Sequence, residues 1–159
     1  MPDTPEWLSE RLISEGEKTV AFFKGLNENQ WDLEVYTDGS HWHIRQVLAH
    51  FAMSEHSLRH LVTNIASGGP GTPIDFDLDA YNERKVGEVQ DMQPEELIAL
   101  FQSNRQETAR VAAALSLEDL ERTGRHPYLG MAPLADILKI IYRHNQIHIR
   151  DLRKILTQA

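Results

Sequence analysis

The sequence contains no cysteine among its 159 residues. This absence excludes disulfide bonds, a catalytic thiol and thiolate metal ligands, so a bound ion would depend on histidine, aspartate and glutamate. Long hydrophobic runs are also missing, and none approaches the roughly 20 residues of a membrane-spanning helix. The first residues carry no basic stretch followed by an apolar one, as a secretory signal would. We therefore expect a cytoplasmic protein without a membrane partner.

Positive charge is scarce as well. The chain has 16 lysines and arginines against 24 aspartates and glutamates, which gives a formal net charge of −8. Nucleic-acid binders usually carry a basic stripe that neutralises phosphates, and no such cluster occurs here, so we expect no nucleic-acid partner. Hydrophobic residues make up 41% and charged residues 25%, which is typical of globular proteins. We assign residues 1–159 to a single domain.

Four segments show the hydrophobic spacing of amphipathic helices, and no convincing alternation typical of a β-strand lies between them. In chain order they run from Thr4 to about Asn27, from about Trp42 to just before Gly68, from Pro94 to about Ser116, and from Pro133 nearly to the C-terminus. Each has one apolar stripe that must be buried against another element. The fold class predicted is therefore all-α, as a four-helix bundle.

The connection between the second and third helices is long. It covers roughly residues 67–93, whereas neighbouring helices in a bundle are usually joined by about 2–8 residues. We expect this segment to cross the end of the bundle, with a short helix over residues 79–89. A crossover of that length can place the second and third helices parallel to each other.

Several polar residues occupy positions where the helical stripes call for apolar ones. On the last helix, His144 and His148 are spaced i, i+4, so both rings lie on one face, one turn apart. His50 lies at the edge of the buried stripe of the second helix. The other interruptions are Glu15, Thr19, Asn104 and Thr108. All fall near the middle of their helices, so we expect them to meet in one polar pocket.

Buried polar groups need partners, and one metal ion would satisfy three imidazoles at once. A single buried histidine more often has an ordinary hydrogen bond, and a His-x-x-x-His pair also occurs by chance. The inward register of His144 and His148, with His50 at similar height, favours a metal site. Glu15 is a candidate general base or hydrogen-bond partner of a ligand histidine. Ion pairing of Glu15 with a neighbouring helix is the alternative.

The remaining candidates are weaker. Four further histidines are expected at the solvated surface, namely His41, His43, His56 and His60. The aspartates at 75, 77 and 79 imitate the start of a calcium-binding loop. Ala80 stands where that loop needs glycine and Val86 where it needs a bidentate glutamate, so we reject a calcium site.

Two stretches of the sequence resemble the DinB-like superfamily, also described as the YfiT-like metal-dependent hydrolases. Residues 42–50 (WHIRQVLAH) resemble the family's tryptophan, amphipathic turn and first metal histidine, here His50. Residues 126–130 (HPYLG), 133–138 and 144–148 (HNQIH) resemble the loop and last helix that supply the other two ligands, here His144 and His148. The likeness covers nearly the whole chain. It implies a four-helix bundle with a long second connection, frequent homodimers, and zinc or nickel on the three histidines.

Three neutral imidazoles leave a coordination position for water or substrate, and a divalent ion there suits hydrolysis or thiol-dependent transfer on a small molecule. Some members of the family act with low-molecular-weight thiols such as mycothiol or bacillithiol. Zinc, nickel and copper all suit three imidazoles. Two alternatives stay open at this point: a non-catalytic metal-binding or stress-response module, and a metal-free helical dimer whose histidines only form hydrogen bonds.

Overall fold

The computed structural model describes residues 3–159. Its body consists of four long helices: α1 (Pro5–Lys24), α2 (Ile44–Ala66), α4 (Pro94–Ala113) and α6 (Leu134–Gln158). The connections carry two shorter helices, α3 (Leu78–Glu88) and α5 (Leu117–Glu121), and a 3₁₀ turn, η1 (Glu28–Gln30). The predicted all-α four-helix bundle is therefore confirmed. No helix within residues 3–159 combines the length and the apolar character needed to cross a membrane.

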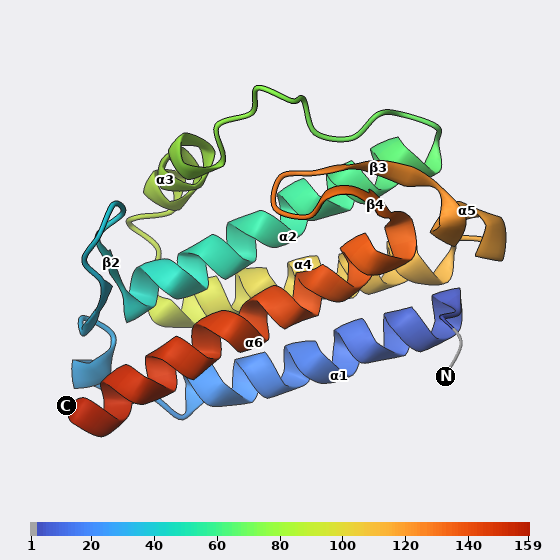
Figure 1. The fold of residues 1–159 in the computed structure, drawn as a ribbon. Helices are drawn as coiled ribbons and strands as arrows, with labels where there is room; N and C mark the ends of the chain where they lie inside the picture. The colour runs from blue at the N-terminus through green and yellow to red at the C-terminus, as the bar shows by residue number, and fades with distance from the viewer. Residues whose placement is uncertain (1–2) are drawn as a thin grey trace.

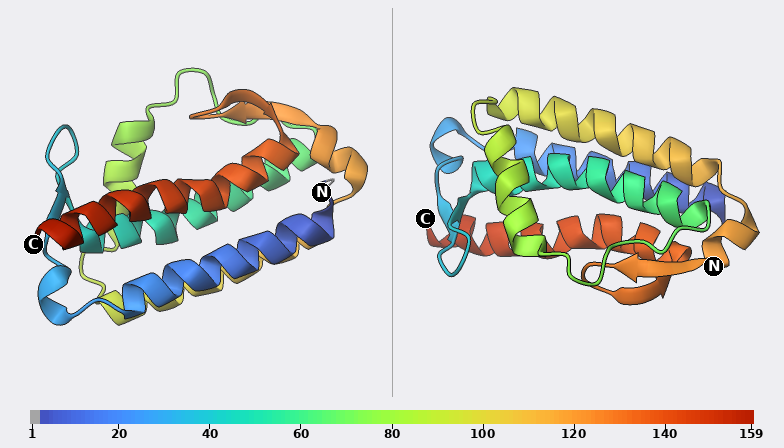
Figure 2. Two further views of the ribbon diagram at one scale, coloured as in Figure 1. Left: turned by 60° about the horizontal axis from the view of Figure 1, so that its bottom comes forward. Right: turned by 90° about the horizontal axis from the view of Figure 1, so that it is seen from above.

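The bundle does not alternate simply up and down. In Figures 1 and 2, α1 and α6 run in one direction, whereas α2 and α4 run in the other. The crossover after α2 returns the chain along the bundle through α3, which lies across α2, to the end where α2 began (Figure 2). This path makes α2 and α4 parallel, which the length of the connection allowed, although the segment runs along the bundle instead of crossing its end.

Two of the predicted helix ends were placed a few residues too late. α1 ends at Lys24 and α4 at Ala113, rather than near Asn27 and Ser116. Both of those residues are N-caps of the following element. The Asn27 side chain accepts a hydrogen bond from the backbone of Asn29 at the start of η1, and Ser116 accepts one from the backbone of Asp119 in α5. Their side chains thus start new turns instead of ending old ones.

The structure also contains two small antiparallel hairpins that the sequence analysis missed. In the first, β1 (Glu34–Tyr36) pairs with β2 (Trp42–His43), directly before α2. In the second, β3 (Thr123–His126) pairs with β4 (Gly130–Pro133), directly before α6. Strands of two to four residues are too short to show a period of two.

The hydrophobic core is divided into two halves by a polar layer. Phe23, Phe51 and Phe101 centre the half toward the first hairpin, and Leu12 and Tyr142 belong to the half toward the second. Between the halves, every long helix contributes polar or small residues: Glu15 and Gly16 from α1, Glu55 from α2, Arg105 and Thr108 from α4, and Asn145 from α6. The three histidines lie near this layer, between α2 and α6.

Candidate metal centre

Three histidines from two antiparallel helices point at one another. The Nε2 atom of His144 lies 3.0 Å from Nε2 of His50 and 2.9 Å from Nε2 of His148. One nitrogen from each of the three rings can be chosen so that all lie within 4.8 Å of one another. Tetrahedral zinc with Zn–N bonds of 2.0–2.1 Å places its nitrogen ligands roughly 3.3 Å apart. The spacing of these nitrogens is therefore close to that of a metal site.

Helix geometry accounts for this convergence. His144 and His148 are one turn apart on α6, and their ring centroids are 4.5 Å apart. His50 approaches from α2, where Phe51 contacts the rings of His144 and His148 at a steep angle, with centroid distances of 5.9 and 5.7 Å. His50 is buried, whereas His144 and His148 are half-buried. The α6 side of the cluster is therefore the more exposed side.

Burial keeps the three imidazoles neutral. Removal from water is the first cause that lowers the pKa of each ring, because it penalises the charged form. The pKa of His144 falls to about 3, with further lowering by the neighbouring His148. The pKa of His50 lies well below its ordinary value, and that of His148 is lowered despite the opposing effect of Asp151. Neutral imidazole is the form that binds metals.

Neutral rings cannot satisfy both short contacts at His144 by hydrogen bonding. A ring nitrogen of neutral imidazole offers either one proton or one lone pair in the plane of the ring. Nε2 of His144 has two nitrogen neighbours at about the same distance. It can donate to one or accept from one, so the other contact lacks a well-directed proton. A cation at the centre of the three nitrogens would use all their lone pairs.

The nitrogens that face away from the centre have partners of their own. Nδ1 of His50 is 3.1 Å from the Ser54 hydroxyl, one turn further along α2. Nδ1 of His148 is 2.7 Å from the Tyr36 hydroxyl, which in turn donates to Asp151 over 2.7 Å. Burial and the hydrogen bond to Asp151 raise the pKa of Tyr36, so its hydroxyl stays protonated. Neither the contact nor the hairpin that carries Tyr36 was predicted from the sequence.

The predicted polar pocket differs in composition from the one observed. Glu15 accepts hydrogen bonds from Lys18 and Gln146 and lies 3.3 Å from Arg11. Burial alone would raise the pKa of Glu15, but these neighbours lower it overall. Within residues 3–159, no hydrogen bond joins Glu15 to the histidines. Glu15 does form ion pairs, but with Arg11 and Lys18 of its own helix, whereas its contact with a neighbouring helix is the hydrogen bond from Gln146 of α6.

Thr19 and Asn104 also bond elsewhere, to the backbone oxygens of Glu15 and Ala52. Thr108 instead joins a buried ion pair that the sequence analysis overlooked. Arg105 donates from Nε and Nη2 to one carboxylate oxygen of Glu55, at 2.9 and 2.6 Å, and Thr108 donates to the other oxygen at 3.0 Å.

Two further contacts complete this network. Arg105 also donates to the backbone oxygen of Leu12 and to the side chain of Asn145, which follows His144 on α6. A signal for the pair was present in the sequence, because Glu55 follows Phe51 by one turn and precedes Val62 by two on the same apolar row.

His126, at the end of β3, is another buried histidine. Its Nδ1 accepts hydrogen bonds from the backbone amides of Tyr128 and Leu129 at 3.0 and 3.1 Å. Burial lowers the pKa of His126 to about 4. Its neutral ring therefore closes the turn of the second hairpin. The other four histidines are exposed, as the sequence predicted.

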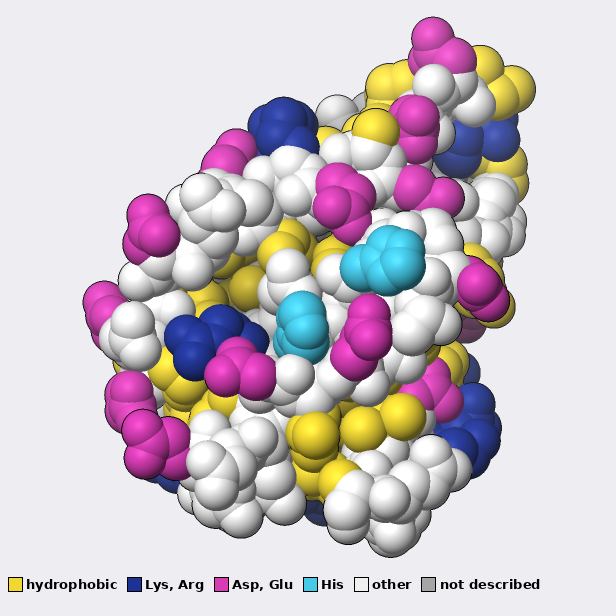
Figure 3. All heavy atoms as spheres, turned by 90° about the vertical axis from the view of Figure 1, so that its left-hand side faces the viewer, with side chains coloured by type: hydrophobic (Ala, Val, Ile, Leu, Met, Phe, Trp, Pro, Cys, Tyr) yellow, Lys and Arg dark blue, Asp and Glu magenta, His cyan; other side chains and the backbone are white. Residues whose placement is uncertain are grey.

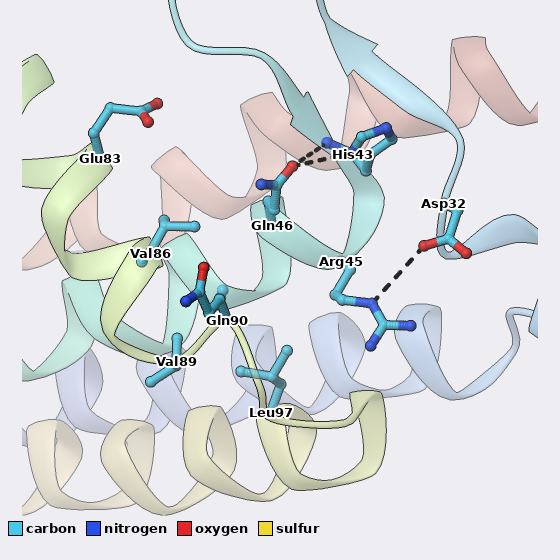
Figure 4. A pocket seen from close by; sticks show the side chains of 11 residues that line it. Asp32, His43, Arg45, Gln46, Glu83, Val86, Val89, Gln90 and Leu97 are labelled. Carbon is cyan, nitrogen blue, oxygen red and sulfur yellow. Dashed lines mark hydrogen bonds and ion pairs between the residues drawn. The ribbon is translucent and has the colours of Figure 1, made fainter.

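A separate hollow lies at the end of the bundle near the first hairpin (Figure 3). It has a volume of about 350 Å³ and contains none of the three central histidines. At its rim, Arg45 faces Asp32 at 4.0 Å and His43 contacts Gln46 at 3.2 Å (Figure 4). Hydrophobic side chains from α3, the following turn and α4 line it, among them Val86, Val89 and Leu97. Charges of both signs and amides thus surround an apolar floor.

Comparison with known proteins agrees with this architecture. A protein of Bacillus cereus (strain 03BB102) named "Putative metal-dependent hydrolase" is 29% identical over 155 residues, which cover 94% of this chain and 85% of that protein. Among solved structures, YfiT from Bacillus subtilis, described as a probable metal-dependent hydrolase with an unusual four-helix bundle topology, superposes with a TM-score of 0.73. It is 21% identical, and the match covers 94% of this chain and 86% of YfiT.

A second similar structure is a mycothiol-dependent maleylpyruvate isomerase, with a TM-score of 0.71 and 15% identity. The match covers 93% of this chain but 59% of that enzyme, and at this identity it supports the fold alone. The sequence model of the DinB superfamily matches residues 11–152, which include all four long helices in whole or large part. The chain therefore belongs to the DinB superfamily.

Proposed function

We propose that His50, His144 and His148 bind one divalent metal ion, and that the protein is an enzyme that uses this ion to act on a small molecule. The observation that carries the proposal is the convergence of three neutral imidazoles on one point, with two Nε2 contacts of 3.0 and 2.9 Å that hydrogen bonds cannot both satisfy. Zinc and nickel are the proposed ions, since nitrogen ligands suit both.

The residues around the histidines suit a catalytic site better than a closed structural one. Three protein ligands leave at least one position open, as in catalytic zinc sites, whereas structural sites have four. Within residues 3–159 no carboxylate or fourth histidine joins the cluster. When bound, the ion would supply a Lewis acid that polarises a water molecule or a carbonyl group. Trp42, whose ring centroid is 4.9 Å from that of His50, shields the inner side from water.

Two reaction classes fit this arrangement. Hydrolysis is favoured because two similar proteins are described as a "Putative metal-dependent hydrolase" and a "probable metal-dependent hydrolase". Transfer that depends on a low-molecular-weight thiol is the second candidate, because a structurally similar enzyme is mycothiol-dependent. The two differ in one requirement. Hydrolysis proceeds without added thiol, whereas transfer needs it.

The first experiment is to measure the metal content of the untagged protein by elemental mass spectrometry. We expect about one ion per chain, lost when His50, His144 and His148 are all replaced by alanine. The exposed His56 and His60, whose Nε2 atoms are 3.3 Å apart on α2, can also collect an ion. The His56→Ala/His60→Ala variant is the control, and it should keep the central ion. A central site that stays empty after purification without chelators would refute the proposal.

Activity is then screened on small esters, amides and reactive electrophiles, with and without a thiol. We expect His144→Ala to abolish turnover in either class, and retained turnover would exclude a metal-dependent reaction. A non-catalytic metal-binding or stress-response role is the outcome if the ion binds but no substrate turns over. Glu15 remains a predicted base, tested by Glu15→Gln, which should slow turnover if the prediction holds. The cytoplasmic location, the homodimer and the lack of a nucleic-acid partner also remain predictions.

A further inference from the structure

Tyr36 connects the first hairpin to the metal-binding face of α6. Its hydroxyl oxygen lies 2.7 Å from Nδ1 of His148 and 2.7 Å from Oδ2 of Asp151. His148 and Asp151 are three residues apart on α6, so both side chains lie on the same face of the helix. The rings of Tyr36 and His148 meet edge to face, with their centroids 5.6 Å apart. The Tyr36 side chain therefore contacts both His148 and Asp151.

The direction of each proton in this chain of contacts follows from the chemistry of the groups. A carboxylate oxygen only accepts, so the single hydroxyl proton of Tyr36 points to Asp151. The Tyr36 oxygen then has only lone pairs to offer to His148. Nδ1 of His148 must carry the ring proton if this 2.7 Å contact is a hydrogen bond. Because a neutral imidazole has one such proton, Nε2 of His148 is left with a free lone pair.

We propose that Tyr36 and Asp151 are positioning residues that hold His148 in the tautomer protonated at Nδ1, with its Nε2 lone pair directed at His50 and His144. Only the metal-binding consequence of this inference rests on the proposed function. The tautomer is a property of the chain without metal. Ligand histidines usually need such an acceptor for the second N–H, which orients the ring and raises its basicity.

His50, which joins the cluster from α2, has no contact that fixes its tautomer in the same way. Nδ1 of His50 contacts the Ser54 hydroxyl at 3.1 Å, and a hydroxyl can either donate or accept. The contact therefore allows both tautomers of His50. The directed chain through Tyr36 therefore decides which nitrogen of His148 is protonated, whereas the contact of His50 with Ser54 does not.

Two paired residues of the first hairpin each contact one of the proposed ligand histidines. Tyr36 in β1 is paired with Trp42 in β2. Tyr36 contacts His148 on α6, while the Trp42 ring lies against His50 on α2 with a centroid distance of 4.9 Å. The hairpin thus contacts the two helices that supply the histidines. The pairing of Tyr36 with Trp42 thus brings one aromatic residue to each of these helices.

The test is nitrogen NMR of the imidazole rings in metal-free protein labelled with ¹⁵N-histidine. We expect His148 to show a protonated Nδ1 and an unprotonated Nε2 in the unmodified chain. Tyr36→Phe removes the hydroxyl alone and should shift His148 toward a mixture of tautomers. Tyr81→Phe is the matched control, because its hydroxyl contacts Ser57 on α2 instead of a histidine. It should leave the His148 signals unchanged.

Zinc affinity, measured by competition with a chelator, provides the second readout. We expect Tyr36→Phe to weaken binding by about 10- to 100-fold, with Tyr81→Phe unchanged. Asp151→Asn alters the same chain from its far end and should move the tautomer in the same direction, even if Tyr36→Phe folds poorly. An Nε2-protonated His148 in the unmodified chain, or tautomers unchanged in both variants, would overturn the inference. If zinc binds to none of the proteins, the proposed metal site fails while the tautomer result still decides this inference.

Discussion

The buried ion pair between Glu55 and Arg105 allows a stability prediction with a built-in control. Both side chains are 2–3% exposed, and their closest N···O distance is 2.6 Å. At an effective dielectric constant of 20, two unit charges at that distance attract by roughly 6 kcal/mol, and desolvation offsets part of this. Glu55→Gln keeps the shape and one acceptor but leaves the guanidinium without a counter-charge in the core.

We expect Glu55→Gln to lower the free energy of unfolding by about 3 kcal/mol, since breaking a buried pair costs 3–5 kcal/mol and the amide still accepts one hydrogen bond. For a chain of this length, that loss corresponds to a fall in Tm of roughly 6–12 °C. Urea denaturation in the presence of a chelator measures the change without any contribution from bound metal.

The control is Glu107→Gln on α4. Glu107 pairs with Arg110 at the surface, where the two side chains are 48% and 73% exposed. An exposed pair contributes about 0–1 kcal/mol, so this variant should be nearly as stable as the unmodified chain. If Glu55→Gln costs no more than Glu107→Gln, the reasoning about a desolvated charge in the polar layer is refuted.

Three further outcomes are expected. Gly16→Ala should destabilise the fold by about 1–3 kcal/mol in urea denaturation, although alanine favours helix, because its Cβ would lie 2.8 Å from Cγ of Arg105. Since burial lowers the pKa of His126 to about 4, the unfolded chain takes up a proton before the folded one. This ring by itself should therefore lower the free energy of unfolding by at most about 3 kcal/mol as the pH drops from 6.5 to 4, and titration of His126→Asn should show a shallower slope. Zinc at 100 times its Kd should stabilise the protein by about 2.7 kcal/mol in thermal melts, an effect that chelators reverse and that His144→Ala lacks.

The sequence alone predicted the features that depend on local order. Helical periodicity located the four long helices, because apolar spacing at about 3.6 residues is a property of neighbouring positions. The length of the segment from 67 to 93 indicated a crossover that allows α2 and α4 to run parallel. The i, i+4 spacing of His144 and His148 placed them on one helical face, and the register of His50 suggested that it joins them.

The partners of the residues in the polar layer could not be predicted from local sequence patterns. Glu55 and Arg105 each interrupt an apolar row, but they are 50 residues apart, and only the packing of α2 against α4 makes them partners. Glu15 interrupts its own row in the same way, yet its partners are Lys18, Gln146 and Arg11. A polar residue in a stripe therefore predicts burial better than it predicts which partner it meets.

The surroundings of the histidines were decided by the tertiary structure. Tyr36 reaches His148 across 112 positions of the chain, through a hairpin too short to leave a periodic signal. The contact between Tyr36 and His148 depends on how the hairpin packs against α6. The spacing of residues within the hairpin or within α6 does not predict this packing. The sequence thus determined which histidines can meet, because helix spacing is local. The fold decided which groups hold them and in which protonation state, because those contacts join residues distant in the chain.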